Sequence, residues 1–160
     1  MAISANLEAL GYGSPSRCIA TGLHREIITG VGTTRFLLPG ESGALCIFDQ
    51  ATTQTWTLPV PVAGMQFEFF WGILRSGTHK ITTSGATVFM LGCVMAGDPS
   101  IATSGDVFEA DGTSIVSYIT DGNTKGGYIG SNLHFTALNS TQWAVRGLVI
   151  GTGTMATGFA

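Results

Sequence analysis

Three histidines are the residues of this chain best suited to metal binding or proton transfer. His24, His79 and His134 lie far apart in the sequence, whereas zinc sites draw His or Cys ligands from local pairs. Histidines on different strands, or one from each of three subunits, could still converge on a metal ion. A lone histidine on a strand is more often an ordinary residue of the pleated surface. The sequence therefore predicts no metal site.

Carboxylates gather in the segment from Gly97 to Gly127, where a general acid–base pair or a calcium site is conceivable. The acidic residues of this segment are Asp98, Asp106, Glu109, Asp111 and Asp121. Two of them open strong turn sequences, Asp111-Gly112-Thr113 and Asp121-Gly122-Asn123. The regular series of oxygen ligands of an EF-hand is absent. We therefore interpret these carboxylates as turn residues.

Motifs for nucleophilic catalysis or nucleotide binding are missing. The chain has no GxSxG elbow and no Walker-type Gly-Lys-Ser/Thr, and its Gly11-Tyr12-Gly13 falls short of a dinucleotide fingerprint. Cys18, Cys46 and Cys93 are widely spaced, form no CxxC pair and sit among apolar neighbours, which predicts buried free thiols. We expect no catalytic residue, no cofactor and no enzyme activity, with a β-barrel enzyme as the least favoured reading.

Composition limits the elements that could position such residues. The chain has 160 residues, 44% of them hydrophobic and 11% charged, against about 25% charged in a typical domain. One domain with a sizeable core is expected. So little charge favours apolar surface covered by neighbouring subunits, although a stable monomer also fits. The seven basic residues are scattered and the net charge is −3, which argues against a nucleic-acid partner.

The ends and the hydropathy of the chain give no sign of secretion or of a membrane. The first residues lack the basic start and the apolar run of a secretory signal. No apolar run approaches the roughly 20 residues that span a bilayer. We expect no membrane partner and synthesis in the cytoplasm.

Short apolar runs with period-two alternation, separated by Gly, Pro, Asp and Asn turns, predict an all-β fold. No segment shows a long amphipathic helical pattern, which argues against a helical fold and against an α/β fold with its crossover helices. We predict an antiparallel β-sandwich or a jelly-roll-like barrel. The expected strands are Arg17–Thr21, Arg25–Thr29, Thr34–Leu38, Ala44–Asp49, Gln54–Leu58, Met65–Trp71, Lys80–Thr83, Thr87–Val94, Val107–Ala110, Ser114–Thr120, Asn132–Ala137 and Gln142–Ile150.

The expected organisation is an extended N-terminal arm over residues 1–16 and a single β-domain over residues 17–160. A loop-rich insertion is expected at about 97–127. The last two strands should form a hairpin that brings Trp143 near Phe135. The Gly- and Thr-rich tail from Gly151 is either a flexible end or a last strand.

Several of these segments together resemble a module of tailed-bacteriophage virion proteins. The residues that carry the resemblance are Glu41-Ser-Gly-Ala-Leu45, Trp56-Thr-Leu-Pro-Val-Pro-Val-Ala-Gly-Met-Gln-Phe-Glu-Phe69, His79-Lys-Ile-Thr-Thr83 and Trp143-Ala-Val-Arg-Gly147. Capsid decoration (cement) proteins, head fibres and some tail-fibre parts share this module. The resemblance covers about residues 41–150 and implies a β-sandwich that sits on the capsid, commonly as a homotrimer. The longer segment Gly97–Gly127 departs from the pattern.

The resemblance implies a structural virion protein made in the host cytoplasm. As a cement protein, it would bind the major capsid protein on the capsid exterior and stabilise the head against internal DNA pressure. The arm would become ordered on docking. The capsid-contact candidates are Ile3, Leu7, Leu10, Arg17 and Arg25.

A head-fibre or tail-fibre adhesin that binds a host glycan or receptor is the alternative. Sugar sites use exposed aromatic rings beside carboxylates and amides. Under this reading the loops of Gly97–Gly127 and their surroundings would hold the ligand. The ligand candidates are Tyr118, Asp121, Asn123 and Tyr128.

Overall fold

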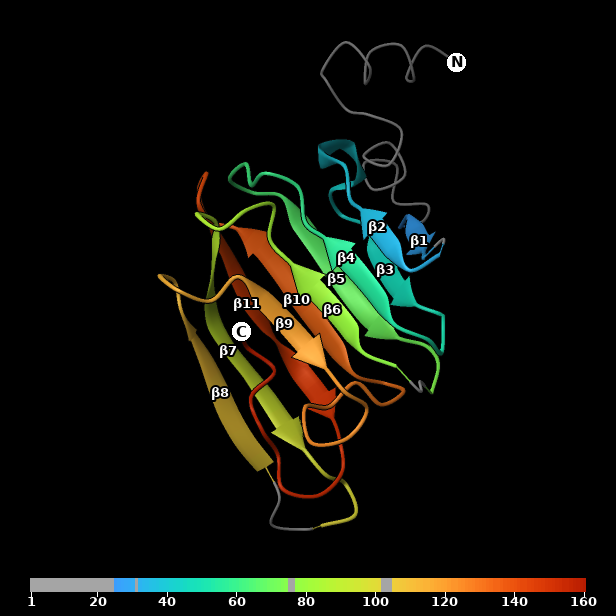
Figure 1. Ribbon diagram of the computed structural model, residues 1–160. Helices are drawn as coiled ribbons and strands as arrows, with labels where there is room; N and C mark the ends of the chain where they lie inside the picture. Colours follow the sequence, from blue (N-terminus) through green and yellow to red (C-terminus); the bar gives the residue numbers. More distant parts are fainter. Residues whose placement is uncertain (1–24, 31, 75–76, 102–104) are drawn as a thin grey trace.

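A computed structural model describes residues 25–30, 32–74, 77–101 and 105–160 (Figure 1). These residues form two β-sheets with a shared apolar core, and in Figure 1 the smaller sheet lies in front of the larger one. The predicted all-β sandwich is confirmed. The predicted arm over residues 1–16 and the predicted strand Arg17–Thr21 lie outside the described residues.

Eleven strands are assigned among the described residues, and each overlaps a strand expected from the sequence. The larger sheet contains, in spatial order, β1 (Ile27–Thr29), β3 (Leu45–Phe48), β5 (Gln66–Trp71), β10 (Asn132–Ala137), β11 (Gln142–Ile150), β7 (Phe89–Gly97) and β8 (Gly105–Asp111). The smaller sheet contains β2 (Thr34–Phe36), β4 (Gln54–Thr57), β6 (His79–Thr82) and β9 (Ser117–Thr120). A 3₁₀ turn, η1 (Pro39–Glu41), follows β2.

From β1 to β6 the chain crosses to the opposite sheet after every strand. Each sheet is therefore re-entered in the same direction, and β1, β3 and β5 pair in parallel, as do β2, β4 and β6. Backbone hydrogen bonds continue the parallel pairing of the smaller sheet just beyond the strand ends. Leu37 N donates to Thr57 O at 2.9 Å, and Leu58 N donates to Thr82 O at 2.8 Å. The sheets are thus mixed, whereas we expected antiparallel pairing, because alternating apolar residues reveal which face is buried but not the direction of a strand.

The C-terminal half closes the sandwich mainly with antiparallel pairs, although its longest pairing, β11 with β7, is parallel. The hairpin β10–β11 has the predicted bounds, and β10 also pairs with β5 while β9 pairs with β6. Strands β8 and β9 both fall in the segment expected to be rich in loops. The tail forms a further edge of the smaller sheet, since Ile119 N donates to Gly158 O at 2.7 Å and Ser117 N to Ala160 O at 2.9 Å.

Aromatic side chains from both sheets meet in the core. The Phe48 ring stacks on Trp71 at 4.7 Å and on His79 of the smaller sheet at 4.5 Å, and it meets Trp56 edge-on at 5.9 Å. All four side chains are fully buried. Aromatic pairs of this kind contribute about 0.5–1.5 kcal/mol each beyond the area they bury.

The hairpin residues Trp143 and Phe135 do not pair with each other as expected. Trp143 lies opposite Ala137 and Phe135 opposite Val145, so the two rings are offset along the strands. The Trp143 ring instead lies 6.0 Å from Phe67, a residue of β5.

Gly92 allows two long strands of the larger sheet to approach closely. Its φ is +133°, and a Cβ at this position would lie 2.2 Å from the carbonyl oxygen of Val145 on β11. No other residue fits there, because the added carbon would overlap backbone rather than a movable side chain. The inward face of β7 therefore has a gap in its row of side chains at Gly92.

We expect Gly92→Ala to lower the free energy of unfolding by about 2 kcal/mol or more, from backbone strain and overpacking together. Denaturant unfolding monitored by tryptophan fluorescence would measure this. Gly85→Ala is the matched control, because nothing lies within 4 Å of the added Cβ and its φ is not in the left-handed region. Equal stability of the two variants would contradict the close approach of β7 and β11.

Candidate interaction surface

The two sheets of the sandwich differ in the chemistry of their outward side chains. We call the outward side of the larger sheet the apolar face. Its apolar residues are Ile27, Leu45, Ile47, Phe70, Leu91, Met95, Val107 and Leu148. We call the outward side of the smaller sheet the hydroxyl face. Its exposed or half-buried residues are Thr34, Phe36, Thr55, Thr57, Lys80, Thr82 and Ile119.

Strand register aligns much of the apolar face into one row, which the exposed polar residue Asn132 interrupts. Ile47 lies beside Phe70, and beyond Asn132 of β10 the row continues through Leu148, Met95 and Val107 to the edge strand β8. Leu148 is 46% exposed, Met95 58% and Val107 64%. Contiguous exposed apolar surface of this kind marks interaction sites more often than scattered apolar residues do.

A second row on the same face carries polar and charged side chains. Register places Glu68 beside His134, His134 beside Arg146, and Arg146 beside Cys93, with Glu109 at the far edge. The face is therefore not uniformly apolar, and its charges stand at its centre and at one edge.

Arg25, a predicted capsid contact, is engaged within the chain. Its guanidinium forms an ion pair with Glu68, and it donates to Gly43 O at 2.7 Å and to Ala44 O at 3.1 Å. These bonds neutralise Glu68 and fix the chain where it enters β1. The other predicted capsid contacts, Ile3, Leu7, Leu10 and Arg17, lie outside the described residues.

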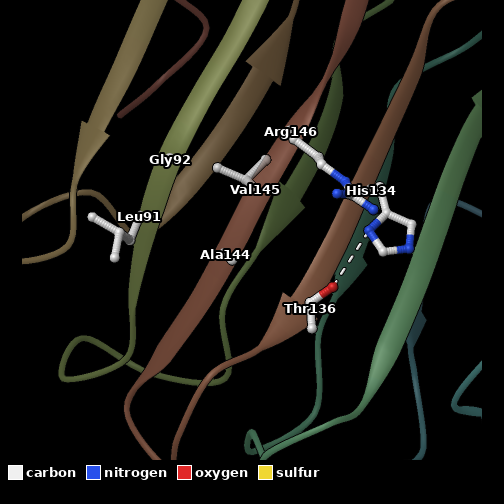
Figure 2. Close-up of a pocket in the computed structure, with 7 residues that line it drawn as sticks. All are labelled: Leu91, Gly92, His134, Thr136, Ala144, Val145 and Arg146. Carbon is white, nitrogen blue, oxygen red and sulfur yellow. Dashed lines mark hydrogen bonds between the residues drawn. The ribbon is translucent and has the colours of Figure 1, made fainter.

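The apolar face is hollowed around its cationic centre. The hollow measures about 440 Å³, and its lining residues are Leu91, Gly92, His134, Thr136, Ala144, Val145 and Arg146. Figure 2 shows the Arg146 side chain extending from β11 toward the His134 ring on β10. Thr136 Oγ1 lies 3.4 Å from His134 Nδ1. The side chains of His134, Thr136 and Arg146 thus line the same hollow.

The His134 imidazole is held in its neutral form. Partial burial and the neighbouring Arg146 guanidinium lower its pKa, and the opposing charge of Glu68 only partly compensates. At neutral pH the hollow therefore carries the charge of Arg146 with an uncharged imidazole beside it.

The four residues predicted to bind a ligand in the adhesin alternative do not form an exposed cluster. Tyr118, expected to be an exposed aromatic ring, is 1% exposed in β9 and meets Phe159 of the tail edge-on at 4.9 Å. This burial also raises the pKa of its hydroxyl. The sequence alone did not reveal this because the tail that covers Tyr118 belongs to a segment with no clear strand pattern.

The other three candidates lie between β9 and β10. Asp121 Oδ1 accepts backbone N–H bonds from Asn123 at 2.8 Å and Lys125 at 2.9 Å, as expected for a turn residue. Asn123 is exposed, and its carbonyl accepts the N–H of Thr152 at 3.2 Å. Tyr128 is half-buried, and its N–H donates to Ile150 O at 3.0 Å.

The predicted turn at Asp111 is likewise present. Its carboxylate accepts the N–H groups of Thr113 at 2.8 Å and Ser114 at 2.9 Å, and these bonds lower its pKa. Within the described residues, no three His, Cys, Asp or Glu side chains are grouped so that they could hold a metal ion.

Besides Tyr118, two further residues differ from the sequence-based expectation in their burial. His79, expected on the pleated surface, is fully buried, and its Nε2–H donates to Gln50 O at 2.8 Å and Thr52 O at 3.1 Å, which fixes the β3–β4 link. Cys93, expected to be buried, is exposed because it falls on the outward side of β7. Cys46 is buried as expected, and burial raises the pKa of its thiol.

Comparison with known proteins identifies no relative: no protein-family model, curated protein or solved structure matches this chain. Among the described residues, no helix is long and apolar enough to cross a membrane. The geometry of the apolar face is therefore the main guide to function. Sequence reasoning missed this face because its rows join residues from strands that are distant in the chain.

We expect Arg146→Ala to raise the pKa of His134, because the substitution removes a neighbouring positive charge and leaves Glu68 in place. A pH titration of the His134 ring proton by NMR would measure this shift. Lys80→Ala, on the hydroxyl face, is the control and should leave the titration unchanged. An unchanged His134 pKa in Arg146→Ala would mean that the two side chains do not share the hollow.

Proposed function

We propose that this chain is a structural virion protein of a tailed bacteriophage, a decoration or cement protein that binds the outer surface of the capsid and stabilises the head. The observation that carries the proposal is the difference between the two outward faces of the sandwich. One broad sheet presents the exposed apolar side chains Leu91, Met95, Val107 and Leu148, whereas the other presents four threonines and one lysine together with exposed Phe36 and half-buried Ile119. Such a molecule is suited to adhere by one face and to meet water with the other.

The proposed mechanism is adhesive and needs no reactive group. A standard protein interface buries about 800 Å² on each partner. Apolar surface buried on binding contributes roughly 25 cal/mol per Å² to the binding free energy. The cost of immobilising the two partners is subtracted from this contribution. A subunit that bridges neighbouring capsid proteins would add this net energy to the contacts that resist internal pressure.

The partners follow from the same proposal. The major capsid protein is the docking partner, and the chain assembles as a homotrimer on the capsid exterior, as the sequence resemblance implies. The low charge of the chain, 11% of residues, agrees with surfaces that are covered in an assembly. The proposal includes no enzyme activity, no cofactor and no nucleic-acid or membrane partner.

We expect Met95→Glu to abolish the binding of the purified protein to capsids that lack it. A charge at a 58% exposed position in the apolar row must be desolvated on docking, which costs several kcal/mol if the charge is unpaired. Co-sedimentation of the protein with capsids measures binding, and the temperature at which the capsids release DNA measures stabilisation.

Thr34→Glu introduces the same charge at an exposed position of the hydroxyl face and should leave binding and heat resistance near wild type. Circular dichroism of both variants checks that they fold. Absence of wild-type binding to capsids would overturn the proposal, and binding to host cells instead would favour a fibre adhesin.

A further inference from the structure

Within the part of the chain that the structure describes, Arg146 at the centre of the apolar face forms no ion pair. The ion pairs among the described residues are Arg25–Glu68 and Arg35–Glu41, and Arg146 takes part in neither. Its side chain is exposed, so water solvates it in the free protein. The neighbouring Glu68 is already paired with Arg25.

The surroundings of Arg146 would lose their water in any close contact. Register places Ala144 and Leu148 on the same side of its own strand, and Leu91 and Met95 on the adjacent strand β7. A partner that covers these apolar side chains must also cover the guanidinium. A charge buried without a counter-charge is strongly destabilising, so an acidic group opposite Arg146 would stabilise such a complex.

The hollow is lined by groups that can donate hydrogen bonds to a carboxylate. A guanidinium can donate two parallel N–H bonds to one carboxylate. The His134 imidazole and the Thr136 hydroxyl line the same hollow beside Arg146. Figure 2 shows these groups over the ribbons of β10 and β11, with the Leu91 side chain on the β7 side. An acidic side chain could enter with its alkyl part against apolar residues and its oxygens against these donors.

We propose that this hollow is the anchor site for an Asp or Glu side chain of the protein that docks on the apolar face. The inference rests on the proposed function, because it names the polar contact within the same interface. The partner surface is apolar, with one carboxylate at its centre. Paired and desolvated Arg residues of this kind contribute a large share of the binding energy in protein interfaces.

The site also makes docking responsive to pH. The charged groups that face His134 are Arg146 on β11, Glu68 on β5 and Arg25 beside Glu68. A docked carboxylate would add one negative charge to this set and favour the imidazolium, so binding takes up a proton. The partner carboxylate remains ionised down to about pH 4–5. Docking therefore tightens as the pH falls from 7.5 to 5.5.

The test measures capsid affinity for the wild type and three variants. Arg146→Glu should weaken binding by about a hundredfold or more, because it places like charges together in the interface. Arg146→Lys should weaken it by about tenfold, since the charge remains but the two parallel bonds are lost. Lys80→Glu, a reversal on the hydroxyl face, should change affinity by less than about threefold, as expected for an exposed charge outside the contact.

Two further arms test the chemistry of the partner and the role of His134. Amidation of capsid carboxylates with a carbodiimide and a neutral amine should abolish wild-type binding. His134→Gln should bind with the same affinity at pH 5.5 and pH 7.5, whereas the wild type binds more tightly at pH 5.5. A pH dependence that persists in His134→Gln would assign the proton to another group and overturn this part of the inference.

The outcomes separate the two proposals. If wild-type protein does not bind capsids, the proposed function fails and the anchor site fails with it. If the wild type binds and Arg146→Glu, folded by circular dichroism, binds equally well, the anchor site alone is overturned. Loss of binding by Arg146→Glu together with insensitivity to amidation of the capsid would also overturn it, since the partner group would not be a carboxylate.

Discussion

The contact of the Phe48 ring with rings from both sheets is the interaction on which the rest of this structure depends. Phe48 stacks on Trp71 of its own sheet and on His79 of the other, and all three are fully buried. Aromatic rings of this size fill the space between two sheets about 10 Å apart. Each strand directs such residues into the core. The residues between them therefore point outward and can form contacts with a partner.

Those outward residues explain why the molecule has two unlike faces. The chain crosses between sheets after each early strand, so residues such as Ile47 and Phe70 come to lie side by side on the larger sheet, and Thr57 and Thr82 on the smaller one. The larger sheet also receives β7, β8 and β11, which extend the apolar row. Burial in the core therefore determines the fold, and the residues that face outward determine which side can bind.

The sequence predicted the strands well because period-two alternation is a local signal. It placed the β10–β11 hairpin correctly and identified Asp111 and Asp121 as turn residues. It could not predict the parallel pairing, which depends on where the chain crosses between sheets. Nor could it predict the burial of Tyr118, which depends on contact with Phe159, or the meeting of His134 with Arg146, which depends on register.

The most direct test of the account is hydroxyl-radical footprinting of the protein, free and bound to capsids. Met95 and Phe36 are oxidisable side chains on opposite faces, 58% and 67% exposed. If the apolar face docks, capsid binding protects Met95 from oxidation and leaves Phe36 as reactive as in the free protein. Protection of Phe36 with no protection of Met95 would contradict it, because the hydroxyl face would then be the side that docks.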